Sequence, residues 1–259
     1  MNSFRVVLYA EVLKIRKSKI LWFTLAAFSI APLMGGFFMF VLKNPELAES
    51  AGLLGAKAQI VGEANWPSYL SLLAQTIAVG GILTFGFITS WVFGREYTDR
   101  TAKDLLALPY SRAIIVNAKF VTILLTNILL SLHVIIVGII IGLVIGLPMW
   151  TLSVVIHGLY VLMITTLLTV ALGTPVAFFA IYGRGYLGPL GFVVLMVVFS
   201  QIIAAAGYGA YFPWAVPALY SGVTGTAQIL PISSVSIVLL VSLLGFISTH
   251  LLWLFADQH

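Results

Sequence analysis

The residues that could do chemistry in this chain are few, and the histidines come first. His133, His157 and His250 stand inside or beside long apolar stretches. A histidine in such a place can ligate a metal, carry a proton or hydrogen-bond to a neighbouring helix. Three scattered imidazoles without carboxylate partners make a poor metal site, so hydrogen bonding between helices is the better prediction.

The sequence also lacks the familiar motifs of catalysis. It holds no HExxH pair, no Asp-rich metal motif, no Gly-x-Ser-x-Gly elbow and no GxxxxGK[ST] phosphate loop. Its apolar runs carry Asp, Glu, Lys or Arg only at their ends, whereas a proton-coupled carrier needs a titrating group inside the membrane. We therefore expect no catalytic, metal or cofactor site in the chain, and the free energy for any transport would come from elsewhere.

The most informative stretch is 94–112, which reads GREYTDRTAKDLLALPYSR. Thr101 and Asp104 fit the [ST]-x-x-[DE] capping signature, which predicts a short helix. Pro109 would end this helix, and Ser111 can cap the next one. Judged from these residues alone, the short helix would either fit a groove on a soluble partner or lie on a lipid surface.

The elements that position these residues are indicated by composition. The 259 residues are 8% charged and 61% hydrophobic, against about 25% and 45–50% in soluble domains. A soluble fold needs more wettable surface than this, and the absence of cysteine excludes a disulfide scaffold. The net charge of +5 is better explained by membrane topology than by nucleic-acid binding. We therefore predict an all-α integral membrane protein with one transmembrane domain over residues 1–259.

Charge-free intervals predict the number of membrane spans. Uncharged runs of 23, 31, 64 and 72 residues follow Lys19, Glu63, Lys119 and Arg184 in that order. A helix needs about 20 residues to cross the hydrocarbon core, so the first two runs hold one span each and the last two hold two each. The six predicted spans are 20–42, 69–94, 117–147, 151–182, 186–206 and 232–256.

The basic residues predict the orientation, because Lys and Arg are enriched in cytoplasmic loops. Eleven of the 13 lie in three segments that share one side if both termini are cytoplasmic: residues 1–19, residues 95–119 and Arg184. The 43–68 loop would then be external, with two lysines against three glutamates. These external charges are Lys43, Lys57, Glu46, Glu49 and Glu63.

Two segments outside the spans have distinct patterns. Residues 1–19 predict a basic interfacial helix, in which Lys14, Arg16 and Lys17 face the anionic leaflet. Glu11 intrudes on the apolar face of this helix and could pair with a basic loop residue. Residues 207–231 are apolar but broken by proline and glycine, which predicts a re-entrant or interfacial hairpin on the outer side.

Small residues recur in the third predicted span. Gly138, Gly142 and Gly146 form two consecutive G-x-x-x-G steps. Such a stripe lets helices approach closely in lipid. It would either pack helices within one chain or form a seam between two copies, and the first is the more common use.

The 94–112 segment resembles the signature of ABC-2 type transporter permeases, an E-Y-x-x-x-T-x-x-x-L-L-x-x-P-x-S-R run that follows the second span. The N-terminal run 11–19 is similar to the family's basic interfacial helix, and the architecture of six spans and a broken outer hairpin is similar over the whole chain. The positions that match the signature are Glu96, Tyr97, Thr101, Leu105, Leu106, Pro109, Ser111 and Arg112.

The resemblance implies a permease subunit without its own ATPase, in the plasma membrane of a bacterium. Two copies would pair as a homodimer with two copies of a separate ABC ATPase, on which ATP and Mg²⁺ would bind. Residues 95–112 would couple the two proteins, chiefly through Glu96, Tyr97, Thr101, Asp104, Leu105, Leu106, Pro109 and Arg112.

The length and compact outer loop further resemble exporters of antimicrobial peptides or drugs, of the bacitracin and lantibiotic self-protection type. An uncharged, aromatic-rich path would suit an amphipathic substrate. Two alternatives stay open from the residues: a carrier driven by an ion gradient, and a membrane immunity or scaffold protein that moves nothing.

Overall fold

The computed structural model describes residues 3–44, 63–223 and 230–255, and all regular structure within them is helical. Six of the helical stretches are long and apolar enough to cross a membrane, as predicted from the uncharged runs. They comprise α2 (Lys19–Lys43), α5 (Trp66–Thr98), α7 (Arg112–Ile145), α8 with α9 (Leu152–Ala171 and Gly173–Tyr182), α10 (Leu187–Ala205) and α12 (Ile232–Phe255).

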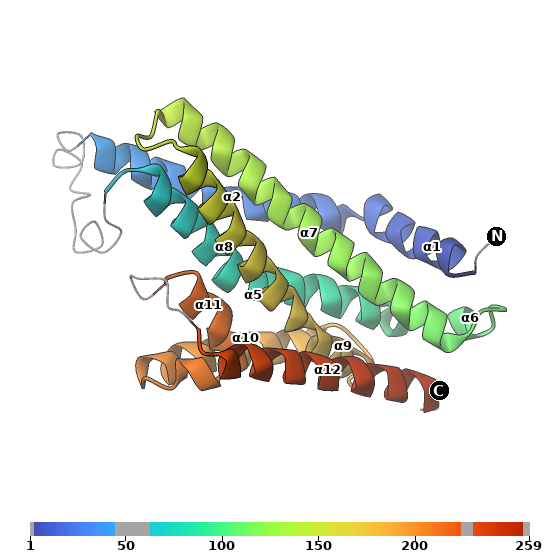
Figure 1. Ribbon diagram of the computed structural model, residues 1–259. Coiled ribbons are helices and arrows are strands. Elements are labelled where there is room, and N and C mark those ends of the chain that lie inside the picture. The colour runs from blue at the N-terminus through green and yellow to red at the C-terminus, as the bar shows by residue number, and fades with distance from the viewer. Residues whose placement is uncertain (1–2, 45–62, 224–229, 256–259) are drawn as a thin grey trace.

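The remaining helices lie at the two ends of the bundle (Figure 1). α1 (Ser3–Lys17) and the short α6 (Ala102–Leu106) lie at the end that also holds both termini, which we call the α6 end. Two 3₁₀ turns, Gly209–Tyr211 and Pro213–Ala215, and α11 (Val216–Tyr220) lie at the opposite end, the α11 end. The segment predicted as an outer hairpin thus consists of short helical pieces, while its residues 224–229 lie outside the described part of the chain.

Local capping explains where the long helices begin. Asn65 precedes α5 and accepts a hydrogen bond from the Ser68 amide at 3.0 Å. Ser111 caps α7 by accepting from the Ile114 amide at 3.3 Å, as predicted, and Thr151 caps α8 in the same way. Each side-chain oxygen satisfies an amide that the first helical turn leaves without a partner.

Two other features end or bend the long helices. α7 stops at Gly146, which adopts the left-handed conformation with φ 66° that glycine tolerates best. Lys43 donates to the last carbonyls there, at 2.7 Å to Ile145 and 2.8 Å to Gly146. Pro175 lacks the amide that would continue the hydrogen-bond ladder from α8, so the fourth span is divided at Leu172 into α8 and α9.

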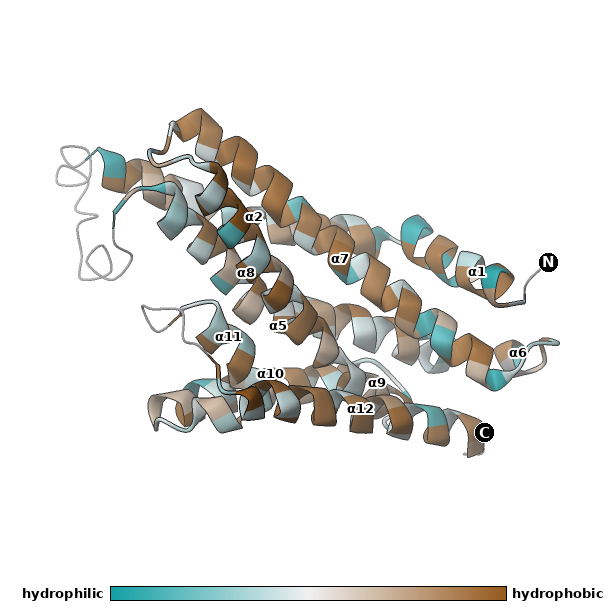
Figure 2. Cartoon of the chain, viewed as in Figure 1, coloured by the Kyte–Doolittle hydropathy of each residue, from teal (hydrophilic) through white to brown (hydrophobic). Residues whose placement is uncertain are grey.

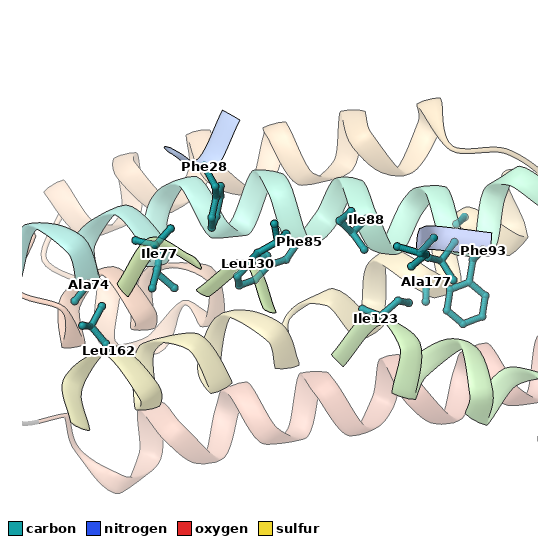
Figure 3. Close-up of a cluster of buried hydrophobic side chains, with 14 of the residues drawn as sticks. Phe28, Ala74, Ile77, Phe85, Ile88, Phe93, Ile123, Leu130, Leu162 and Ala177 are labelled. Atoms are coloured by element: carbon teal, nitrogen blue, oxygen red, sulfur yellow. The ribbon is translucent and has the colours of Figure 1, made fainter. Parts of the chain in front are cut away.

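The core forms around α5, the most buried of the six spans. α5 packs against α8, α9, α7, α10 and α2, and the cluster in Figure 3 includes Ile77, Phe85 and Ile88 from α5. Across the bundle, they face Phe28 of α2 and Leu130 of α7. Burying one helix in the middle of five others holds both of its ends at fixed positions.

The outer surfaces of the other spans are apolar. Figure 2 shows hydrophobic residues over most of α7, α10 and α12, with hydrophilic residues concentrated at the helix ends and on α1. Large apolar side chains are exposed along these three helices and along α2, as a lipid-facing surface requires. Examples are Phe23, Phe37, Ile136, Leu143, Leu195, Leu240 and Leu244.

Candidate functional site

The last turn of α5 carries a buried carboxylate. Glu96 is only 2% exposed although it lies close to the end of the helix. A buried charge is costly unless it is paired and hydrogen-bonded. The groups that pair with Glu96 therefore show how this end of the molecule stabilises a buried charge.

Two lysines and a second glutamate surround Glu96. Lys119 of α7, which is completely buried, lies 2.9 Å from Glu96 Oε1 and 3.0 Å from Glu11 Oε2. Lys14 of α1 lies 2.9 Å from Glu96 Oε1 and 2.7 Å from Glu11 Oε1. We call Glu11, Lys14, Glu96 and Lys119 the ion cluster; it joins α1, α5 and α7 in one charge-balanced group.

The donors of Lys119 are fully used. Its ammonium group donates to both carboxylates and, at 3.1 Å, to the carbonyl of Val92. An ammonium group has three hydrogens, so none is left without an acceptor. Lys119 thus acts as the fixed centre of the ion cluster.

Lys14 stays charged at physiological pH. Its partial burial would lower the pKa of the ammonium group, but the carboxylates of Glu11 and Glu96 raise that pKa above its ordinary value of 10.5. A raised pKa keeps the contribution of Lys14 to stability at every pH below the ordinary value, and the contribution is lost only as the pH rises through the folded-state pKa.

The turn after α5 is fastened to the ion cluster by Thr101. Its hydroxyl donates to Glu96 Oε2 at 2.6 Å, and its amide donates to the Glu96 carbonyl at 2.8 Å. Arg100, just before it, adopts a left-handed conformation with φ 59°, which reverses the chain toward α6. Two hydrogen bonds thus hold the residue before α6 against Glu96.

The predicted capping of α6 by the Thr101 side chain is wrong. Thr101 stands at the N-cap position but makes no side-chain cap. A carboxylate is a stronger hydrogen-bond acceptor for the hydroxyl because the bond is charge-assisted, and Glu96 is within reach. The pattern of Thr101 and Asp104 locates the helix correctly, but for a different physical reason.

α6 presents one face inward and one outward. Leu105 is buried in the main core, whereas Lys103, Asp104 and Leu108 are exposed. The exposed Pro109 follows the helix, and the side chain of Leu106 lies outside the described residues. The outward side of α6 and the turn after it thus expose two charged side chains and the apolar side chain of Leu108.

The other predicted coupling residues attach the segment to α12. The ring of Tyr97 packs edge-on against Trp253 at 6.2 Å between centroids. Arg112 donates to the carbonyl of Leu254 at 3.0 Å and so covers the end of α12. The basic residues Arg16 and Lys17 of α1 are exposed and lie apart from the ion cluster.

Lys119 is the residue that the sequence-based prediction of the site omits. The sequence places it among the basic residues of the 95–119 segment but not among the coupling residues. The signal that could have identified it is position: Lys119 lies in the second turn of a long apolar helix, where a cation needs a buried partner. Glu11, on the apolar face of α1, is one such partner, and Glu96 is the other.

The glycine stripe is used within the chain. A side chain at Gly138 would collide with Leu73, and one at Gly142 would collide with Trp66, both on α5. Gly146 instead provides the left-handed end of α7. The close approach of α7 to α5 thus accounts for the two helical glycines.

The histidines have separate surroundings. His133 contacts the hydroxyl of Ser29 at 2.7 Å, and His250 contacts Asn117 at 3.0 Å and the Phe246 carbonyl at 3.0 Å. His157 lines a cavity at the α11 end. Among the residues that the structure describes, no three His, Cys, Asp or Glu side chains gather where they could hold a metal ion.

Six apolar helices, with a paired ion cluster held at one end, define a multi-pass membrane protein. A family model described as "ABC-2 family transporter protein" matches residues 7–200, and the chain therefore belongs to the ABC-2 transporter family. Permeases of this family are membrane subunits that work with an ABC ATPase.

A curated relative supports this assignment. The chain is 27% identical over 134 residues to the bacitracin transport permease protein BCRB of Bacillus licheniformis. The match covers 52% of this chain and 64% of the relative, so the chain spans less than two thirds of that protein's length.

Proposed function

We propose that the chain is the permease subunit of an ATP-driven exporter and that residues 95–112 form its contact with the ATPase. The observation that carries the proposal is the ion cluster, because it joins α1, α5 and α7 through paired charges, and Thr101, just before α6, hydrogen-bonds to its Glu96. A displacement of α6 on ATP binding would move α5 and α7 together.

The basic residues at the α6 end support a particular orientation of the chain in the membrane. Ten of the 11 basic residues expected on one side lie in α1, α2's first turn and residues 95–119, at the α6 end, and Arg184 lies in the turn beside Gly94. Basic residues favour the cytoplasmic side, so we place the α6 end and both termini in the cytoplasm. α6 would then be accessible to an ATPase in the cytoplasm.

The assembly we propose has two copies of the chain and two copies of a separate ATPase, which binds ATP and Mg²⁺. An amphipathic cargo such as an antimicrobial peptide or drug is supported by the similarity to a bacitracin transport permease and by the apolar spans. Export of such a compound would protect a bacterium from it, and the protein would act in the plasma membrane.

Co-purification tests the contact directly. Candidate ABC ATPases from the source genome are co-expressed with the tagged full chain, and the captured ATPase is quantified. Leu108→Asp places a charge in the exposed turn that follows α6 and should reduce capture at least about tenfold, since it removes apolar contact and buries a charge. Leu187→Asp is the matched control, because Leu187 is exposed at the same end in the first turn of α10.

Each result separates the candidates. Capture by wild type and Leu187→Asp but not by Leu108→Asp supports the proposal. Equal capture by both variants contradicts the assignment of α6. If no ATPase is captured and an ion gradient alone drives transport by the chain in liposomes, the protein is a secondary carrier; cargo binding without transport would identify an immunity protein.

A further inference from the structure

A cavity of about 350 Å³ opens at the α11 end, away from the ion cluster. Its walls are the first turns of α5 and α8, together with Ser221 at the end of α11. This volume lies in the range of sites that bind small molecules, about 300–1,000 Å³. The cavity lies within one copy of the chain.

The floor of the cavity is apolar. Leu70 of α5 and Val154 and Val161 of α8 line it. Gly158 also lines it, and a side chain there would collide with Leu70, so the backbones of α5 and α8 approach closely at the floor. An aliphatic chain would find continuous contact along this surface.

The rim of the cavity carries hydrogen-bonding groups. Neither the imidazole of His157 nor the hydroxyl of Ser153 has a hydrogen-bond partner among the described residues, and both side chains are exposed. By contrast, Ser71 is engaged: its hydroxyl donates to the Ser221 carbonyl at 3.3 Å and accepts from Gln75 at 3.1 Å. The free donors are thus concentrated on α8.

The charge environment favours an anion over a cation. Among the residues that the structure describes, none of those lining the cavity is acidic, and the amino-terminal ends of α5 and α8 both face this region with their positive half-dipoles. Glu63, just before α5, has its carboxylate beside the Asn65 side-chain amide at 3.4 Å and is not among the lining residues. A neutral imidazole can donate one hydrogen bond and a charged one can donate two, so His157 serves as a donor in either state.

We propose that this cavity binds a membrane amphiphile with an anionic oxygen headgroup, a phosphate or a carboxylate. The headgroup accepts hydrogen bonds from His157 and Ser153, and its aliphatic chain lies along Leu70 and Val161. The site goes beyond the proposed export function, because binding needs neither the ATPase nor ATP.

Photolabelling of the full chain in dodecyl maltoside micelles, a detergent without an anionic group, tests the site. The probe is phosphatidic acid with a photoreactive acyl chain, and labelled peptides are located by mass spectrometry. We expect labelling within 67–71 and 153–161. Ser153→Phe, which fills the rim, and His157→Ala, which removes a donor to a charged group, should each reduce it about tenfold.

The matched control is Ser233→Phe. Ser233 is an exposed serine at the second position of α12, as Ser153 is at the second position of α8, but it does not line the cavity. Labelling of Ser233→Phe should equal that of wild type. A monodisperse elution profile for each variant shows that loss of labelling does not come from misfolding.

Two further arms identify what the cavity recognises. Diacylglycerol with the same photoreactive chain lacks the anionic head and should label at least about tenfold less. Excess inorganic phosphate supplies the anion without the chain and should not compete. Undiminished labelling of Ser153→Phe, equal labelling by diacylglycerol, or competition by phosphate would each overturn the proposal.

Discussion

At the scale of single residues, Lys119 decides the energetics of the α6 end. It is completely buried and holds two carboxylates that come from helices distant in sequence, Glu11 being 108 residues away. Replacing every charged residue of a buried ion cluster by an apolar residue can leave the stability of the protein unchanged. Removing only one of them is destabilising, because it leaves the remaining charges buried without a partner. The cluster is therefore more sensitive to a single substitution than to a matched pair of substitutions.

Lys119→Met should destabilise the protein by about 3–5 kcal/mol, because Glu96 loses its main buried partner. The double variant Glu96→Gln with Lys119→Met should recover part of this loss, since it removes the stranded charge and leaves Glu11 paired with Lys14. Thermal unfolding of the purified chain in detergent measures both. A single variant as stable as wild type would show that the charges are not paired as described.

At the scale of the elements, α5 is the structural centre of the bundle, and its contact with α7 depends on the absence of two side chains. Gly142 faces the ring of Trp66, and Gly138 faces Leu73. Packed interiors resist added atoms because neighbouring side chains must leave their preferred rotamers. The same contact helps to hold Lys119 of α7 against Glu96 of α5.

Gly142→Ala should therefore lower the free energy of unfolding by about 1–3 kcal/mol. At Gly191 of α10, an added methyl group would meet no other atom within 4 Å, so Gly191→Ala should be neutral or slightly stabilising. Thermal unfolding of the two variants under one detergent condition makes the comparison. Equal stability of both variants would contradict the close approach of α7 to α5.

The spans could be predicted from the sequence because their cause is local. The length of an uncharged run is enough to predict a membrane helix without knowledge of the residues that pack against it. In the same way, Ser111 caps α7 through a bond to Ile114, only three residues away. The ion cluster could not be assembled in this way, because pairing Glu11 with Lys119 requires the positions of α1 and α7 in space. Thr101 could not be predicted for the same reason. Its local pattern indicates a helix cap, but its hydroxyl donates instead to the carboxylate of Glu96, which the fold brings close.

At the scale of the whole molecule, the two ends are chemically different. The α6 end combines both termini, the ion cluster and most basic residues, whereas the α11 end holds the cavity and the short helices before α12 (Figure 1). The proposed exporter would require such polarity, because the ATPase would act on one side of the membrane and the cargo would be released on the other.

The proposed orientation can be tested by labelling, because the chain has no cysteine of its own. A membrane-impermeant maleimide applied to intact cells should label Ser233→Cys, at the α11 end, and not Leu108→Cys. Leu108→Cys should become reactive only after the membrane is permeabilised. The reverse pattern would place α6 outside the cell and exclude a cytoplasmic ATPase contact.

The proposed coupling of α6 to the spans through Glu96 is tested most directly by ATP hydrolysis in the assembled complex of permease and ATPase. Thr101→Val removes the 2.6 Å hydrogen bond to Glu96, whereas Thr98→Val removes only a 3.3 Å bond within α5. With assembly unchanged, we predict that Thr101→Val lowers hydrolysis toward the rate of the isolated ATPase, since only the bond from the backbone amide to the Glu96 carbonyl then remains, and that Thr98→Val matches the wild-type complex. A wild-type rate in the assembled Thr101→Val complex would contradict the coupling.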